Sequence, residues 1–272
     1  MPEGDTIFRA AAALDRALAG RVLVRFEAAR LAHRPFRPGT VVSGVEARGK
    51  HCLVHFDDGR TLHTHMRMTG SWHLYRPGER WRKKPGAARV VLEVAPTEER
   101  EAWVAVCFAA PVVELLDDSQ QATGHLGPDL CRPDPDLDEA VRRMGELSQP
   151  DRLIGDALLD QRVSSGIGNV FKCEACFAAG VDPATPVGLV GEDVRRQLLD
   201  VAGRQLRANL GTIDRSTSAW GGLAVYGRDG RPCRRCGTPI RAAKQGKDAR
   251  ITYWCPSCQP APGPGSGPGS PG

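Results

Sequence analysis

Four cysteines near the C-terminal end constrain the fold of this 272-residue chain more than any other feature. They form two Cys-x-x-Cys pairs separated by eighteen residues. Zinc prefers four tetrahedral thiolates, and each pair supplies two of them from one tight turn. We therefore expect one structural zinc ion in a C-terminal zinc-finger β-hairpin, with no open coordination position for catalysis. The predicted ligands are Cys233, Cys236, Cys255 and Cys258.

The basic charge of the chain is concentrated on the same hairpin. The whole chain has a net charge of +5, whereas the segment from Arg228 to Arg250 has eight basic and two acidic residues, a net charge of +6. A basic cluster on a metal-supported hairpin is typical of a surface that binds a polyanion. The alternative is a solvated surface without a ligand, and the charge alone does not choose between the two.

Composition indicates a soluble, cytoplasmic protein. The mean hydropathy is −0.33, and no run of eighteen apolar residues could span a membrane. The first five residues include two acids and no basic flank, unlike a secretory signal. Most of the nine cysteines lie in Cys-x-x-Cys pairs, a pattern that favours metal binding in a reducing compartment over disulfides.

The hydrophobic periodicity predicts an α+β, multidomain chain. Residues 6–19 should form a helix, capped by Asp5 or Thr6 and ended by Gly20. From residue 21 to 116 short β-branched runs predict a β-sandwich behind that helix. The expected domains are the N-terminal β-sandwich domain 1–118, a hinge 119–138, a helical domain 139–225, the zinc finger 226–260 and a disordered tail 261–272.

Two further pairs of cysteines or histidines have the spacing of metal ligands, but we expect neither pair to bind a metal ion. Cys173 and Cys176 fall in a predicted helix with no second pair nearby, so packed free cysteines are the better interpretation. His63 and His65 would share one face of a strand without an evident third ligand. We interpret them as hydrogen-bonded or DNA-facing histidines.

The start of the chain has a chemical use if Met1 is removed. Pro2 would then carry a secondary amine, which can attack an electrophilic carbon and form an iminium. A chain-terminal amine has a pKa of about 7.7–8.0, so part of it is unprotonated at neutral pH. The positive end of the following helix favours ionised Glu3, so burial or substrate must raise the pKa of Glu3 before it can donate a proton.

Taken together, these residues resemble the family of formamidopyrimidine-DNA glycosylase and endonuclease VIII. The similarity extends over roughly residues 2–258, with the motifs in the family's order. The motifs are the Met-Pro-Glu-Gly-Asp start, Arg48-Gly49-Lys50, the helix–two-turn–helix segment Gln161–Asn169, and Tyr226-Gly227-Arg228 before Cys233 with Arg250 five residues before Cys255.

The resemblance implies a bifunctional DNA glycosylase and AP lyase of base excision repair that acts on double-stranded damaged DNA as a monomer near the nucleoid. Pro2 would attack C1′ of the damaged nucleotide, and Glu3 would assist opening of the sugar ring. Lys50 would assist β-elimination and Arg250 δ-elimination, each also contacting phosphate. Asn169, expected in an exposed glycine-flanked turn, would bind backbone phosphate.

Three further residues are candidates for DNA contacts. Met68, after Arg67, occupies the place where the family has a side chain that fills the gap left by a flipped base. A methionine in the hairpin core is the alternative. His125 falls in the hinge where endonuclease VIII has a basic DNA-binding residue.

Lesion preference follows from a departure from the purine-specific branch. That branch has a loop with arginine and phenylalanine late in the β-domain, whereas the stretch from Ala109 to Val113 has neither. We therefore expect oxidised pyrimidines to be favoured. The alternatives are an oxidised-purine glycosylase and a non-catalytic protein that binds damaged DNA on the same scaffold.

Overall fold

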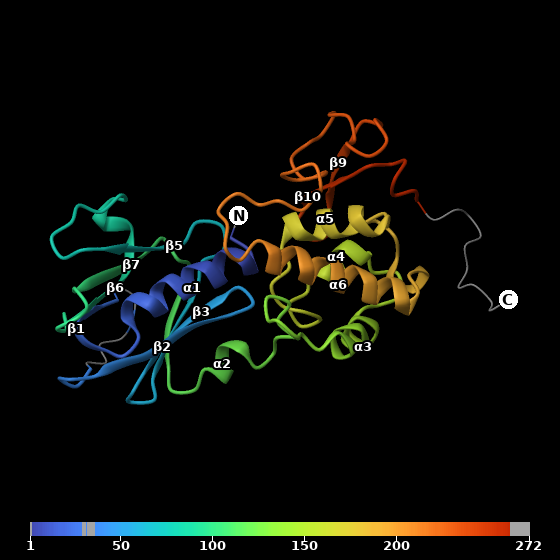
Figure 1. The fold of residues 1–272 in the computed structure, drawn as a ribbon. Coiled ribbons are helices and arrows are strands. Elements are labelled where there is room, and N and C mark those ends of the chain that lie inside the picture. The colour runs from blue at the N-terminus through green and yellow to red at the C-terminus, as the bar shows by residue number, and fades with distance from the viewer. Residues whose placement is uncertain (1, 29–30, 32–35, 262–272) are drawn as a thin grey trace. The chain divides into compact units, whose positions relative to one another are not determined.

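The computed structural model describes residues 2–28, 31 and 36–261. The chain divides into two compact units, residues 1–125 and 126–272 (Figure 1). Each unit is described by itself below. No helix among the described residues has the length and apolar character needed to cross a membrane.

The first unit begins with helix α1 (Gly4–Leu18). Its predicted apolar stripe is buried, because Ile7, Leu14 and Leu18 are each at most 1% exposed. A fully buried leucine or isoleucine contributes about 1.5–3 kcal/mol, so this stripe fixes the helix on the sheet. The predicted start was wrong. The N-cap is Glu3, and the helix already includes the two residues expected to cap it.

Antiparallel strands form the rest of the first unit. They are β1 (Arg21–Glu27), β2 (Val41–Arg48), β3 (His51–Phe56), β4 (Thr61–His65), β5 (Ser71–Tyr75), β6 (Ala88–Val94), β7 (Trp103–Phe108) and β8 (Val112–Leu116), with the short 3₁₀ helix η1 (Pro85–Ala87) before β6. Their hydrogen-bonded order is β5-β7-β6-β1-β2-β3-β4-β8. Strand β1 joins the two halves of this order, because its first two residues pair with β2 and its later ones pair with β6, with a register shift between Leu23 and Arg25.

Both halves of this order contribute to one core with α1. Val42 and Val54 come from one half and Val90 and Leu92 from the other, and all four are 0% exposed in the same hydrophobic cluster as the helix. This arrangement confirms the predicted fold class of an N-terminal helix with β-sheet layers. The segment after β8, predicted as a hinge, contains the short helix α2 (Gln120–Thr123).

The second unit is helical up to the hairpin. Its helices are α3 (Leu137–Leu147), α4 (Ile154–Leu159), α5 (Asn169–Ala179), the 3₁₀ helix η2 (Val187–Leu189) and α6 (Glu192–Ala208). Helix α5 is buried almost all round and packs against α6, α4 and the hairpin, so it is the central element of this unit. Gly180, with φ +72°, ends it in the left-handed conformation that glycine adopts without strain.

Strands β9 (Arg241–Gln245) and β10 (Arg250–Trp254) form the predicted C-terminal hairpin. The base of the hairpin shares a small core with α5, in which Cys173 and Phe177 meet Ile240 and Cys255. Only Ala261 of the predicted tail 261–272 lies among the described residues.

Candidate functional site

The start of the chain meets helix α1 at a buried carboxyl group. Glu3 is 0% exposed, and Pro2 directly before it is partly buried. The carbonyl oxygen of Glu3 accepts hydrogen bonds from the N–H groups of Thr6 (3.0 Å) and Ile7 (3.1 Å), so the first helical turn fixes its backbone. Met1 lies outside the described residues. From the sequence we expect Glu3 to need burial, or a bound substrate, before it can donate a proton, and Glu3 is buried.

Lys50 lies in the tight turn between β2 and β3. The last pair of this hairpin is Arg48 with His51, which leaves a two-residue turn of Gly49 and Lys50. Gly49 has φ +55°, the sign that the first position of such turns requires. Lys50 is partly buried. The hairpin therefore presents the lysine from a two-residue turn at the ends of two paired strands, not from a long loop.

A chain of hydrogen-bonded side chains follows Lys50 across three strands. The Nδ1 of His51 lies 2.8 Å from Nε2 of His63, whose Nδ1 lies 2.8 Å from a carboxylate oxygen of Glu114. Burial, together with the neighbouring histidines and Lys50, lowers the pKa of His51 to about 3, so it is neutral at physiological pH. The ring of His125, which is exposed, lies 6.1 Å from that of His51.

His51 and Glu114 were not recognised in the sequence. Only the register brings them together, since His63 pairs directly with Glu114 and lies two residue pairs along the β3–β4 ladder from His51. The hydrogen bonds confirm the interpretation of His63 as a hydrogen-bonded histidine.

His65 is a neutral hydrogen-bond donor. Its Nδ1 accepts a hydrogen bond from the backbone N–H of Arg67 at 3.2 Å. Burial lowers the pKa of His65 to about 4. Since Nδ1 is an acceptor and the ring is neutral, the proton must be on Nε2. The ring can therefore donate to a negatively charged group without being a cation.

The turn after β4 exposes the methionine that the sequence suggested as a wedge. Met68 is 64% exposed, whereas Met66 is the core methionine, at 2%. The alternative that Met68 belongs to the hairpin core was therefore wrong. Arg67, also exposed, has φ +44°, and a hydrogen bond of 2.8 Å from Gly70 N–H to the Met66 carbonyl closes the turn.

Asn169 differs from its expected environment. It is the first residue of α5 and is 3% exposed, not exposed in a turn. Its Nδ2 donates to the carbonyl oxygen of Ile251 at 2.8 Å, and Nζ of Lys172 donates to the hydroxyl of Thr252 at 2.6 Å. Burial lowers the pKa of this lysine. Helix α5 thus holds strand β10 through two polar side chains, and the phosphate-binding role of Asn169 stays a prediction.

Arg250 begins strand β10, directly before the residues that α5 holds. Its side chain is 36% exposed, and its guanidinium forms an ion pair of 3.0 Å with Asp248, whose side chain is 71% exposed. An ion pair this open to water contributes at most about 1 kcal/mol, so a phosphate can readily replace the aspartate. The two groups line an open pocket together with Lys247 and side chains of α4.

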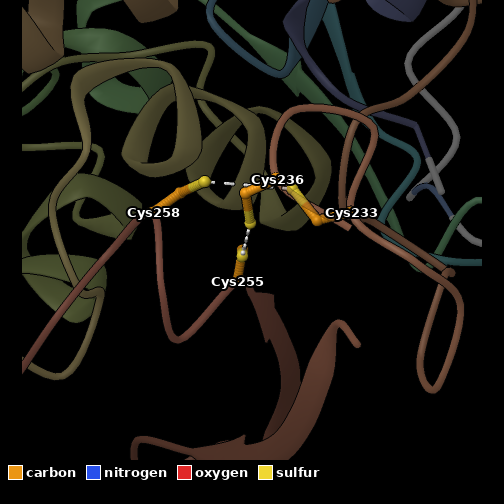
Figure 2. A group of neighbouring side chains, drawn as sticks. All are labelled: Cys233, Cys236, Cys255 and Cys258. Carbon is orange, nitrogen blue, oxygen red and sulfur yellow. Dashed lines mark hydrogen bonds between the residues drawn. The ribbon is translucent and has the colours of Figure 1, made fainter. Parts of the chain in front are cut away.

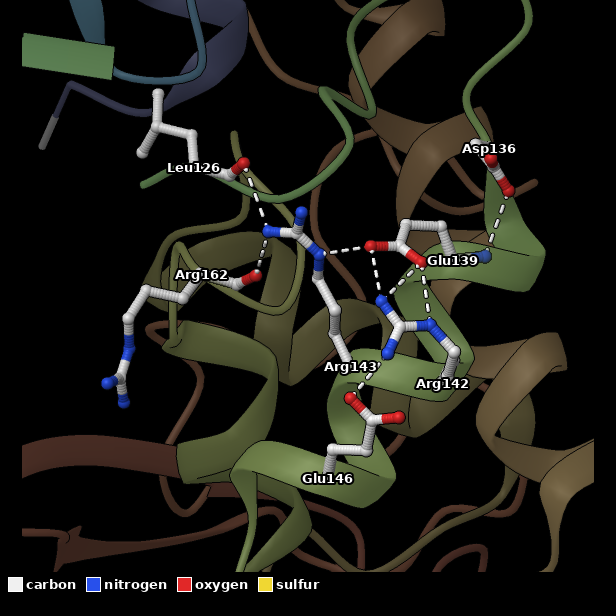
Figure 3. Close-up of polar contacts among 7 residues, drawn as sticks. All are labelled: Leu126, Asp136, Glu139, Arg142, Arg143, Glu146 and Arg162. Atoms are coloured by element: carbon white, nitrogen blue, oxygen red, sulfur yellow. Dashed lines mark hydrogen bonds and ion pairs between the residues drawn. The ribbon is translucent and has the colours of Figure 1, made fainter. Parts of the chain in front are cut away.

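Arg143 of α3 ties the beginning of the second unit to the turn before α5. Its guanidinium donates to the carbonyl oxygens of Leu126 (3.2 Å) and Arg162 (3.1 Å), as Figure 3 shows. Next to this contact a Cβ on Gly127 would lie 2.3 Å from the carbonyl oxygen of Val163, so only glycine fits. These contacts hold the backbone at Leu126 and Gly127 against the turn that contains Arg162 and Val163.

The four predicted zinc ligands converge at the base of the hairpin (Figure 2). Their sulfur atoms all lie within 4.8 Å of one another, with Cys236 and Cys255 3.5 Å apart and Cys233 and Cys258 3.9 Å apart. A tetrahedral zinc ion with Zn–S bonds of about 2.3 Å separates its sulfurs by about 3.8 Å, so the four thiols fit a structural zinc ion. Cys173 and Cys176, in contrast, are buried in α5 as predicted.

Family models match both ends of the chain. Residues 1–105 match the formamidopyrimidine-DNA glycosylase N-terminal domain, and residues 230–261 match the zinc finger found in FPG and IleRS. The fold is similar to that of the Lactococcus lactis formamidopyrimidine-DNA glycosylase bound to DNA containing an AP site. The TM-score is 0.77 at 22% identity, covering 95% of this chain and 100% of that one.

Curated relatives match nearly the whole chain. It is 46% identical to the probable endonuclease 8 2 of Streptomyces coelicolor, over 97% of both chains. It is 37% identical to the DNA-(apurinic or apyrimidinic site) lyase Nei2 of Mycolicibacterium smegmatis, and 31% identical to an Escherichia coli endonuclease 8. Those two matches cover 96% and 95% of this chain and 100% of each relative. The chain therefore belongs to the formamidopyrimidine-DNA glycosylase and endonuclease VIII family.

Proposed function

We propose that this DNA glycosylase and AP lyase of base excision repair removes oxidised bases, pyrimidines in preference to purines, through an imine at Pro2. The observation that carries the proposal is the buried carboxyl of Glu3 directly after Pro2, at the start of α1. An amine that attacks a sugar carbon needs a nearby acid for the sugar oxygen, and neighbouring residues on a fixed helix start supply both groups.

The chemistry begins with the nitrogen of Pro2, unblocked by loss of Met1. The nitrogen attacks C1′ of a nucleotide flipped out of the duplex and loses its proton, and the bond from C1′ to the base breaks as the base leaves with a proton. Glu3 gives a proton to the ring oxygen as the C1′–O4′ bond breaks, which leaves an iminium between Pro2 and C1′. Loss of a proton from C2′ then expels the 3′ phosphate in β-elimination. In δ-elimination loss of a C4′ proton expels the 5′ phosphate.

Other residues would hold the DNA during these steps. Lys50 would assist the β-elimination from its rigid turn, and Arg250 would hold a phosphate and assist the δ-elimination. Met68 and Arg67, on the exposed turn after β4, would fill the gap that the flipped nucleotide leaves. His125 would contact the backbone. The zinc ion would hold the hairpin that carries Arg250.

The short connection between β7 and β8 supports a preference for oxidised pyrimidines. Strand β7 ends at Phe108 and β8 begins at Val112, so only three residues join them. A turn this short has no room for an extended loop with arginine and phenylalanine. We further propose that the protein acts as a monomer in the cytoplasm.

Borohydride trapping on abasic duplex DNA tests the imine. The mature protein should give a covalent adduct, and Pro2→Gly should give less because a primary amine replaces the proline nitrogen. A preparation with Met1 retained should give none, and full trapping by that preparation would refute the assignment of Pro2.

Two comparisons complete the test. Glu3→Gln should slow base release, because the amide has no proton to give to the sugar oxygen. Excision of thymine glycol and 8-oxoguanine from matched duplexes tests the lesion preference, and faster release of 8-oxoguanine would favour the oxidised-purine alternative. A protein that binds damaged DNA without any adduct would be the non-catalytic alternative.

A further inference from the structure

The loop between β5 and β6 carries a second concentration of positive charge. From Arg76 to Arg89, the second residue of β6, there are six basic residues and one acidic residue, a net charge of +5 in fourteen residues. This equals the net charge of the whole chain. The loop is remote in sequence from the zinc-finger hairpin and contains none of the residues assigned to catalysis above.

Two side chains fix the middle of this loop to the protein. The indole of Trp81 packs edge-on against Phe108, with ring centroids 5.7 Å apart. Nζ of Lys83 donates to the hydroxyl of Ser71 at 2.8 Å. The backbone between them is held as well, because the N–H of residue 82 donates to the hydroxyl of Tyr75 at 3.1 Å. Residues 81–83 of the loop are therefore held in place by contacts with β5 and β7.

The alternate residues point away from the protein. Arg80, Arg82 and Lys84 are exposed, whereas the two residues between them are only partly exposed. Within the described parts of the chain, no acidic side chain forms an ion pair with any of these three. The one acid of the loop, Glu79, instead accepts a hydrogen bond from the backbone N–H of Arg76 at 2.9 Å. These three cations thus line one open pocket, and none of them has an ion-pair partner among the described residues.

The loop lies away from the proposed nucleophile within the first unit. In Figure 1 the teal segment between β5 and β6 is at one end of this unit, and the start of the chain is at the opposite end. Two segments that are far apart in one view are also far apart in space. A ligand bound by the loop is therefore not the nucleotide that reacts at Pro2.

We infer that Arg80, Arg82 and Lys84 form a second DNA-binding surface, which contacts the phosphate backbone of duplex DNA outside the lesion. The inference rests on the proposed function in one respect, that duplex DNA is the substrate. Guanidinium groups match phosphate oxygens in geometry, and contacts to phosphates need no sequence. Such a surface would increase the residence of the protein on undamaged DNA during the search for lesions.

An acidic protein segment is the competing ligand, and the structure favours DNA over it. Stable protein–protein contacts depend on exposed aromatic or apolar anchors at their centre. Here the one aromatic residue of the loop, Trp81, packs inward against Phe108 and Tyr75. What the loop offers to a ligand is charge without an apolar anchor.

The test uses the full-length R80Q/R82Q/K84Q variant and a long undamaged duplex. The affinity is measured at several salt concentrations. The slope of log K against log salt should decrease by about 0.9 for each phosphate that the variant no longer binds, up to about 2.7 for three. The control R142Q/R196Q/R204Q removes the same charge from exposed arginines that have acidic partners, and it should leave the slope nearly unchanged.

Two measurements separate the possible failures. Borohydride trapping on a short abasic duplex should be equal in the loop variant and the unmodified protein. If neither protein is trapped, the proposed function is refuted. The salt slopes still decide whether the loop binds DNA. An unchanged slope in the loop variant would overturn the inference. Loss of binding to polyglutamate with unchanged DNA binding would also overturn it, in favour of an acidic protein partner.

Discussion

Replacement of Glu174 should destabilise the segment that leads into the zinc finger more than any exposed charge would. This carboxylate is 1% exposed. It accepts hydrogen bonds from the backbone N–H groups of Ala224 (2.8 Å), Val225 (2.9 Å) and Tyr226 (2.8 Å), and from the hydroxyl of Thr217. One side chain of α5 therefore satisfies three consecutive backbone donors some fifty residues later in the chain.

The expected magnitude follows from those hydrogen bonds. Each buried N–H group left without an acceptor costs about 1–3 kcal/mol. Glu174→Ala leaves three, and we expect a loss of about 3–5 kcal/mol because Tyr226 is partly open to water. In Glu174→Gln one oxygen can still accept from Val225 and Tyr226. The Thr217 hydroxyl can turn to accept from the new amide, so only Ala224 loses its partner, at about 1–3 kcal/mol.

Hydrogen exchange at residues 224–226 measures the local opening free energy, and urea denaturation measures the global one. The control is Glu146→Gln, which removes an exposed carboxylate of α3 paired with Arg142. It should change stability by less than about 0.5 kcal/mol. If Glu174→Ala and Glu174→Gln had equal effects, no larger than that of the control, the hydrogen bonds would not support this segment.

Three further predictions concern pH, zinc and DNA. His51 and His65 have folded-state pKa values of about 3 and 4 against an ordinary value of 6.5, so the unfolded chain takes up protons first as the pH falls. Stability should therefore decrease from about pH 7 towards pH 4, and H51N/H65N should flatten that decrease in urea denaturation. Chelation of zinc, or Cys255→Ser, should lower the thermal unfolding temperature and abolish DNA binding, and an unchanged melting curve would contradict a structural zinc ion. Arg250→Ala should weaken binding to abasic duplex DNA and reduce the salt slope by about 0.9, whereas an unchanged slope would mean that Arg250 does not contact phosphate.

The features that the sequence predicted correctly depend on short separations. Two residues between the cysteines of each pair suffice to place two sulfurs on one knuckle, so the zinc ligands could be named from spacing alone. The period of Ile7, Leu14 and Leu18 likewise predicted the buried face of α1. The start of that helix was misplaced, because acidic and hydroxyl residues follow one another there and capping preference does not distinguish them.

Tertiary structure decided which distant groups meet. The contact of His63 with His51 and Glu114 depends on the register of three strands, and a shift of one residue would turn each side chain to the opposite face. Burial of Asn169 depends on strand β10, which lies eighty-two residues later in the chain. Sequence patterns record the periodicity and chemistry of neighbouring residues, whereas partners across the core are chosen by packing the whole chain.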